Sequence, residues 1–322
     1  MRAVVTILAV ASLFISAPSF GQESTPLKVV GSQGVTRIGI LVPDVEKAAA
    51  AFADIFGVEK TPFKDVKAPG FPVGYTGDKH AYTRVAHLRF DNVVLEVAQP
   101  MGGQSPWREF LDTYGPGLHY LAFAVTGLED NVRLLQSKGG TRVVGAAGGQ
   151  SAVVDLMSKL GINLELHEAS PAGPAPLPSS DGQSGAGLKT ISRIGLLVPD
   201  TDPIGAAFAE LFGMPVKAPI NEEGFFPDNP KTGIRDSFVP FENMWVNAIQ
   251  PLGGKSVWRD MVERHAGYLN FFVDDVDAVV DRLVKRGGTR TLGTTGMPFA
   301  YVDMERQLGV TILLLKSGIM AQ

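Results

Sequence analysis

Two neighbouring strands of the sequence carry a histidine and a glutamate that could act together. Asp91-Asn92 lies between two runs of β-forming residues and is typical of a tight hairpin turn. Counting outward from that turn places His87 opposite Glu96 on one face of the sheet. A histidine beside a carboxylate suits general acid–base catalysis and also metal binding, so this pair is the first candidate for a functional site.

A later strand adds a second carboxylate. Asn163, Glu165 and His167 alternate along it and share one face, with His167 nearer the rim because same-face neighbours lie about 6.5 to 7 Å apart. Two carboxylates in one cavity can divide the roles of acid and base when their surroundings separate their pKa values. The two histidines and two glutamates would also be an acceptable ligand set for a divalent ion of zinc, iron, manganese or cobalt.

The chain positions these residues within a duplicated unit. VTRIGILVPD (residues 35–44) returns as ISRIGLLVPD (residues 191–200), and FDNVVLEVAQPMGGQSPWREF from Phe90 returns as FENMWVNAIQPLGGKSVWRDM from Phe241. Because the blocks keep their order, they predict two copies of one domain. We place domain 1 at residues 35–168, a Pro/Gly/Ser-rich linker at 169–189 and domain 2 at 190–316.

Each copy divides again into two modules that run strand, helix and then several strands. In the first, a strand at 36–42 leads to Asp44, which can cap a helix that Gly57 stops. In the second, a strand at 119–125 is again followed by a helix of apolar spacing. This order predicts an α+β fold.

The motifs RIGILVPD, LEVAQP, GPGLHYLAFAV and GINLELHE carry a family resemblance. They resemble the vicinal oxygen chelate superfamily, which includes glyoxalase I, extradiol dioxygenases and bleomycin-resistance proteins, and they are most similar to methylmalonyl-CoA-epimerase-like and glyoxalase-like members. The resemblance implies two tandem domains, each of two paired βαβββ modules whose sheet curls around a cavity. One such fold hosts many reactions.

The resemblance also implies where ligands to a metal would stand. Metal-dependent relatives carry a histidine on the first strand of each module and a Glu or Gln on the last. The matching first-strand residues here are Arg37 and Tyr120, and the last-strand residues are Glu96 and Glu165. Because arginine is permanently protonated and offers no lone pair, we expect no metal or other cofactor. In the second copy the positions of Arg37, His87, Glu96, Tyr120, Glu165 and His167 hold Arg193, Phe238, Asn247, Tyr268, Leu313 and Leu315.

These residues predict an enzyme of isomerase, epimerase or lyase type that acts on a small carbonyl- or carboxylate-bearing molecule. Glu96 or Glu165 would remove a proton next to a carbonyl, Tyr120 would donate to the developing oxyanion, and Arg37 would hold an anionic or carbonyl oxygen. His87 and His167 would help bind the substrate. One alternative is a bleomycin-resistance-type protein that sequesters a small molecule, and another is an enzyme with a displaced metal at His87, Glu96, Glu165 and His167.

Three aromatic residues are expected to take no direct part in catalysis or ligand binding. Strand alternation turns His119 to the face opposite Tyr120. Trp107 and Trp258 recur in matched segments, SPWREF and SVWRDM, and are interpreted as packing residues.

The first residues resemble an export signal. Arg2 precedes an apolar run over residues 3–15 that is too short to span a bilayer, and small residues follow up to Gly21. We expect cleavage after Gly21 and a periplasmic or secreted mature protein with no membrane attachment. The domains would pair within the chain. A formal charge of -4 argues against nucleic acid, and the absence of cysteine excludes thiolate chemistry.

Overall fold

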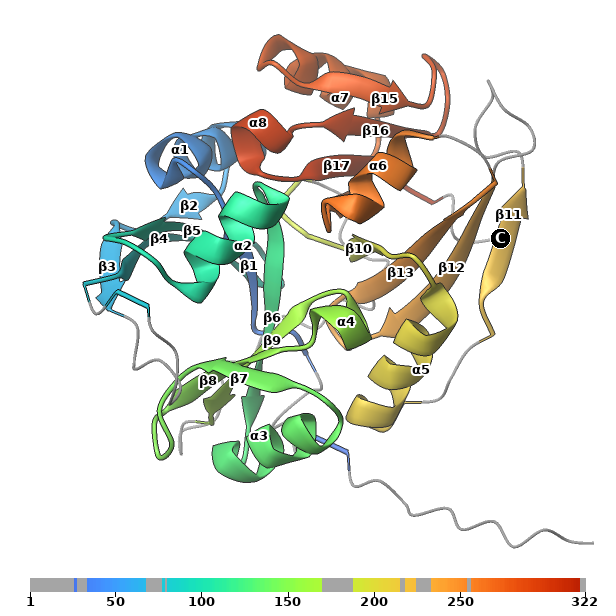
Figure 1. The fold of residues 1–322 in the computed structure, drawn as a ribbon. Coiled ribbons are helices and arrows are strands. Elements are labelled where there is room, and N and C mark those ends of the chain that lie inside the picture. The colour runs from blue at the N-terminus through green and yellow to red at the C-terminus, as the bar shows by residue number, and fades with distance from the viewer. Residues whose placement is uncertain are drawn as a thin grey trace, which may run out of the picture.

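The protein is described by a computed structural model over residues 26–27, 34–67, 77–78, 80–169, 188–214, 218–223, 233–253 and 256–318. The expected signal peptide (1–21) lies outside the described residues, as does most of the expected linker. No helix in these ranges is long and apolar enough to cross a membrane. In Figure 1 the first repeat runs from blue to green and the second from yellow to red, and each forms its own sheet.

The first sheet is built from two modules joined side by side. Its elements in chain order are β1 (Arg37–Leu41), α1 (Val45–Phe56), β2 (Glu59–Lys60), β3 (Lys64–Lys67), β4 (Tyr82–Arg89), β5 (Val94–Met101), α2 (Pro106–Tyr114), β6 (Gly117–Val125), α3 (Leu128–Ser137), β7 (Thr141–Val144), β8 (Ser151–Asp155), α4 (Met157–Leu160) and β9 (Asn163–Glu168). The strand order is β2-β4-β5-β1-β6-β9-β8-β7, with β3 added on β4. The antiparallel pair β1 and β6 joins the modules, so both contribute to one continuous surface.

The second sheet repeats this topology. Its elements are β10 (Arg193–Leu197), α5 (Thr201–Phe212), β11 (Ile220–Glu223), β12 (Gly233–Pro240), β13 (Trp245–Leu252), α6 (Val257–Glu263), β14 (Gly267–Val273), α7 (Val276–Lys285), β15 (Thr289–Leu292), β16 (Phe299–Asp303), α8 (Glu305–Leu308) and β17 (Thr311–Lys316). The order is β11-β12-β13-β10-β14-β17-β16-β15. The predicted α+β class, with two paired βαβββ modules in each of two tandem domains, is confirmed.

Local sequence explains where the first helix of each domain begins and ends. The Asp44 side chain accepts a hydrogen bond from the Lys47 N–H at 2.9 Å, which satisfies a free donor of the first turn of α1. Gly57 ends the helix at φ 64°, a left-handed conformation that glycine adopts without a steric penalty. Asp200 and Gly213 repeat both devices at α5.

Alternation along β1 separates the core from the site. Ile38 and Ile40 are fully buried in the main core with the apolar faces of α1 and α3. Arg37 and Gly39 therefore point to the opposite face, which these helices leave free for other side chains.

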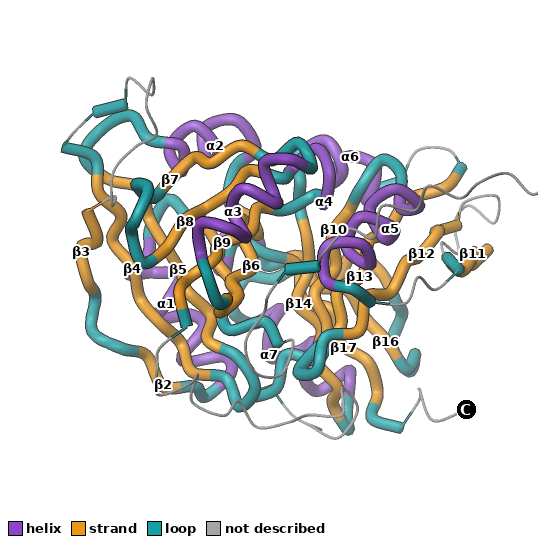
Figure 2. The backbone as a smooth tube through the Cα atoms, turned by 90° about the horizontal axis from the view of Figure 1, so that it is seen from below, coloured by secondary structure: helices purple, strands orange, loops and turns teal. Residues whose placement is uncertain are grey.

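The two domains contact each other through equivalent elements. Helix α1 packs on α8 and α4 packs on α5, and Figure 2 shows α4 and α5 next to each other. Two buried hairpin asparagines cross the interface. Asn92 donates to the Ile191 carbonyl (2.8 Å) and the Asn243 carbonyl (2.7 Å), while Asn243 donates to the carbonyls of Val35 (2.8 Å) and Asn92 (2.9 Å). The contact is reciprocal, as expected for duplicated domains.

Candidate functional site

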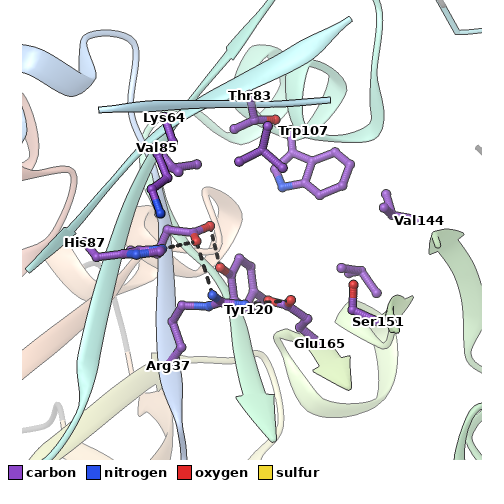
Figure 3. A pocket seen from close by; sticks show the side chains of 13 residues that line it. Arg37, Lys64, Thr83, Val85, His87, Trp107, Tyr120, Val144, Ser151 and Glu165 are labelled. Atoms are coloured by element: carbon purple, nitrogen blue, oxygen red, sulfur yellow. Dashed lines mark hydrogen bonds and ion pairs between the residues drawn. The ribbon is translucent and has the colours of Figure 1, made fainter. Parts of the chain in front are cut away.

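A cavity of about 200 Å³ lies on the free face of the first sheet. Figure 3 shows it with polar side chains at its base and apolar ones along its walls. It is lined by Arg37, Lys64, Val66, Thr83, Val85, His87, Glu96, Trp107, Tyr120, Val144, Ser151, Val153 and Glu165. Five of the six site residues expected from the sequence line this cavity, and His167 does not.

Strand register explains how the polar residues meet. The hairpin pairs His87 with Glu96, as counting from its turn predicted. Gly39 of β1 lies beside both Glu96 and Tyr120 in the two neighbouring strands. A Cβ at Gly39 would lie only 2.1 Å from Tyr120 Cε1, so the tyrosine ring crosses β1 where the backbone carries no side chain. Sequence reasoning missed this role of Gly39, although the recurring I-G-I and I-G-L triplets were its signal.

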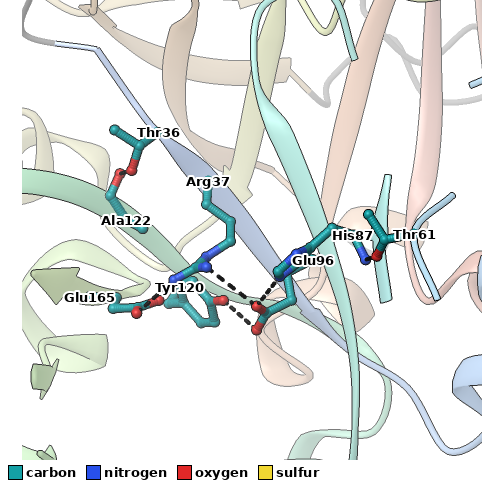
Figure 4. Close-up of polar contacts among 8 residues, drawn as sticks. All are labelled: Thr36, Arg37, Thr61, His87, Glu96, Tyr120, Ala122 and Glu165. Carbon is teal, nitrogen blue, oxygen red and sulfur yellow. Dashed lines mark hydrogen bonds and ion pairs between the residues drawn. The ribbon is translucent and has the colours of Figure 1, made fainter. Parts of the chain in front are cut away.

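Arg37 is the centre of the polar network, which Figure 4 shows from a second side. Its Nη2 donates to Glu165 Oε1 at 2.7 Å, and its Nη1 lies 3.6 Å from Glu96 Oε2, an ion-pair distance longer than a hydrogen bond. Its guanidinium carbon lies 5.9 Å from the Tyr120 ring centroid. One fixed cation thus bridges the two carboxylates.

Glu96 accepts more contacts than Glu165. The Tyr120 hydroxyl donates to Glu96 Oε1 at 2.6 Å, and His87 Nε2 lies 2.8 Å from Glu96 Oε2. The His87 backbone N–H donates to Thr61 Oγ1 at 3.0 Å, which anchors this strand position. Glu96 is therefore held on three sides, by His87, Tyr120 and Arg37.

The surroundings separate the pKa values of the two carboxyl groups. Burial raises the pKa of Glu96, but the hydrogen bond from His87, the Arg37 charge and the hydrogen bond from Tyr120 outweigh it and lower the pKa below its ordinary value. Burial also raises the pKa of Glu165, and although Arg37 opposes this, repulsion from Glu96 adds to it and the pKa stays raised. Glu96 is therefore the stronger acid of the pair.

The other two groups keep their protons. Burial, followed by the charge of Glu96, raises the pKa of Tyr120 well above its ordinary value, so the hydroxyl remains a donor. Burial lowers the pKa of Arg37, but Tyr120, Glu165 and Glu96 more than compensate, and the pKa lies above its ordinary value. The site therefore combines one fixed cation, one neutral donor and two distinct carboxyl groups.

His167 stands apart from this network. It follows Glu165 on the same face of β9, and its Nδ1 is buried with no hydrogen-bond partner among the described residues. Burial, and then the Arg37 charge, lower its pKa.

The expectation for His119 was wrong about the face of the sheet. Strand β6 bulges at His119, since Gly39 faces Tyr120 whereas the next residue of β1 faces Leu118. The His119 ring packs edge-on against Phe110 of α2, with centroids 4.7 Å apart, within a cluster that borders the cavity. The inserted residue breaks the alternation. Burial lowers the pKa of His119 to about 3, so its imidazole ring is neutral and serves as a packing group.

The two tryptophans differ. Trp258 is buried in a core cluster, as expected, but Trp107 lines the cavity and so has a ligand-facing side as well as its packing role.

The residues of the cavity do not fit a metal ion. At the positions where the resemblance places metal ligands, Arg37 brings its own cation between Glu96 and Glu165. Within the described part of the chain, no three His, Asp or Glu side chains are grouped so as to hold a metal. The geometry therefore does not support the displaced set that includes His87 and His167.

The equivalent face of the second sheet is filled by side chains. Tyr301 stands where the first domain has Val153, and it packs with Trp258 and Tyr268 at centroid distances of 5.0 and 5.5 Å. Leu313 takes the position of Glu165 in the same cluster. Arg193 lies 5.2 Å from the Phe238 ring centroid, where Arg37 has His87 and Glu96 nearby.

Known proteins resemble this chain in sequence and in fold. Residues 36–165 match the family model described as Glyoxalase/Bleomycin resistance/Dioxygenase superfamily. Over 134 residues the chain is 25% identical to a Mus musculus protein named Methylmalonyl-CoA epimerase, mitochondrial, covering 41% of this chain and 67% of that protein. A triple mutant of 4-hydroxymandelate synthase from Streptomyces coelicolor superposes with a TM-score of 0.60 and 15% identity, covering 91% of this chain and 94% of that one. The latter shows a shared fold. Residues 36–165 are thus similar to the glyoxalase/bleomycin resistance/dioxygenase superfamily, and the same strand topology returns in the second half of the chain.

Proposed function

We propose that domain 1 is a metal-independent enzyme that moves a proton at a carbon next to a carbonyl group of a small molecule. The observation that carries this proposal is the Arg37 guanidinium bridging Glu96 and Glu165. A permanent cation at the base of the cavity can stabilise negative charge on a substrate oxygen, which is the task a metal performs elsewhere.

The two carboxyl groups would then have different roles. Glu165 has the raised pKa and the fewer hydrogen bonds, so it is the proton acceptor. Glu96 stays ionised and orients Tyr120 and His87.

The step balances without a cofactor. Glu165 takes the α-proton, the C–H electrons form the enolate double bond, and the carbonyl oxygen gains the negative charge. Arg37 Nη1 is the donor available to that oxygen, and the Tyr120 hydroxyl can join it when it turns away from Glu96, to which it donates its single proton. Return of the proton to the other face gives epimerisation, whereas loss of a β-substituent gives elimination. The similarity to a named epimerase supports proton transfer as the reaction class.

Exchange of substrate α-protons for solvent deuterium, followed by NMR across a panel of small oxo acids and esters, tests this proposal. Glu165→Gln is expected to slow exchange at least about 100-fold, the usual contribution of a general base. Glu168→Gln is the matched control, because Glu168 lies at the end of the same strand and binds the backbone of α3 instead. Ligand binding without exchange in the unmodified protein would instead indicate sequestration.

We also propose that the protein acts outside the cytoplasm, on the basis of residues 1–21. The intact mass of the exported protein should correspond to a chain that begins at Gln22. Retention of residues 1–21 would refute cleavage.

A further inference from the structure

A lysine on β3 gives the cavity a second cation. Lys64 and Val66 line the cavity, and alternation turns Asp65 and Lys67 to the opposite face, where Asp65 binds Arg84 Nε at 2.8 Å. In Figure 3 the Lys64 side chain extends from the upper wall toward His87 at the base. Lys64 is solvent-exposed at the rim, and its ammonium group points toward the cavity.

This cation is not neutralised by the protein as Arg37 is. Among the described residues, no carboxylate lies within ion-pair distance of Lys64, whereas Arg37 is matched by Glu96 and Glu165. The neighbouring segment 68–76, outside the described residues, contains no Asp or Glu. Lys64 is therefore a cation with which an anionic group of a ligand can pair directly.

The cavity also limits the size of that ligand. The cavity volume is about 200 Å³. Drug-sized ligands need about 300 Å³ or more. The walls are apolar, formed by Val66, Val85, Val144, Val153 and Trp107. A short apolar body fits inside the cavity.

We propose that Lys64 recognises a carboxylate, so the substrate is a small free oxo acid whose carboxylate meets Lys64 while the C–H carbon next to its ketone lies near Glu165. A single free ammonium suits a monoanion, since a phosphate dianion would call for further donors. This inference rests on the proposed proton transfer and adds the class of substrate.

The second domain lacks both the cavity lysine and the proposed base of the first domain. Ile220 occupies the position of Lys64, because β11 pairs it with Asp236 as β3 pairs Lys64 with Val85. Leu313 likewise replaces Glu165. The cation and the proposed base are therefore present in one domain and missing from the other.

Calorimetric titration of the whole protein with pyruvate, acetoacetate, α-ketoisovalerate and their neutral methyl esters tests the inference. We expect at least one acid to bind tighter than its ester, and Lys64→Met to weaken that acid about tenfold or more, the effect of losing a charged hydrogen bond, without changing the ester. Lys67→Met is the matched control from the same strand and should change neither affinity.

Two results separate this inference from the proposed reaction. The role of Lys64 would be overturned if acid and ester bound equally well, if neither bound, or if Lys64→Met had no effect. This holds even where Glu165-dependent deuterium exchange persists. Lys64-dependent binding of an acid with no exchange of its α-protons would keep the anion site and refute the proposed reaction.

Discussion

Individual residues set the chemistry of the cavity through what each one touches. Arg37 supplies a charge that no pH in the working range removes, because its carboxylate partners hold the proton on it. Glu96 and Glu165 share that cation, yet Glu96 has two further partners, Tyr120 and His87. This unequal hydrogen bonding, together with the repulsion that Glu96 exerts on Glu165, separates their pKa values.

The pH dependence of exchange follows from Glu165. A base works only when deprotonated, so exchange should rise with pH through an apparent pKa above the ordinary 4.5 of glutamate. Glu96→Gln removes the like charge that raises the pKa of Glu165, so the acid limb of the profile should move to lower pH. A pH–rate series on both proteins measures this shift. An unmoved or upward-shifted limb would show that Glu165 is not the titrating base.

Gly39 allows Tyr120 to reach Glu96. Gly39→Ala places a methyl group where the tyrosine ring lies, so we expect a stability loss of about 1 to 3 kcal/mol together with loss of deuterium exchange. Gly195→Ala is the matched control, because a Cβ there would lie 1.9 Å from Tyr268 in the second domain. Both variants should lower the denaturation midpoint, but only Gly39→Ala should affect exchange. Equal exchange in the two variants would contradict the asymmetry of the domains.

At the scale of elements, sequence pattern predicts regular strands well and fails where a strand is irregular. Counting from the hairpin turn paired His87 with Glu96 correctly because β4 and β5 run without interruption between them. The same counting misplaced His119, since one inserted residue in β6 shifts the faces on either side. Lys64 was missed because the short strand β3 has no local signal for pairing with β4.

Burial of His119 at the bulge of β6 also makes the free energy of unfolding depend on pH. His119 has a pKa of about 3 when folded and about 6.5 when unfolded, so between these values the unfolded chain binds the extra proton. The contribution of neutral His119 to the free energy of unfolding is fully present above pH 6.5. As the pH falls below 6.5, this contribution decreases by about 1.4 kcal/mol per pH unit. Urea unfolding at pH 7 and pH 5 should show a smaller difference for His119→Phe than for the original protein. Identical differences would contradict this burial.

Across the whole molecule, duplication has produced two sheets that share a core but differ in their free faces. The filled face of the second sheet, with Tyr301 and Trp258, leaves it packed where the first sheet is hollow. The interface asparagines couple the domains, since each is buried and bonded to the other half of the chain. We expect the second domain to support the first without a reaction of its own.

Asn92→Ala tests that coupling. It removes the Asn92 side chain from the Ile191 N–H and from the carbonyls of Ile191 and Asn243, which should cost about 1 to 3 kcal/mol per lost hydrogen bond and separate the unfolding of the two domains. Asn131→Ala is the control, because Asn131 is buried but bonds within its own domain, to Thr126 and Gly127. Calorimetry should resolve two transitions for Asn92→Ala only. A single transition in both variants would show that these hydrogen bonds do not link the domains.

We propose that Arg37 takes the place of a metal in a proton-transfer site. Exchange of substrate α-protons by the purified protein after dialysis against a chelator tests this, with the metal content of the same sample determined. We expect unchanged exchange in metal-free protein and its loss in Glu165→Gln. Exchange that the chelator abolishes and an added divalent metal restores would contradict it.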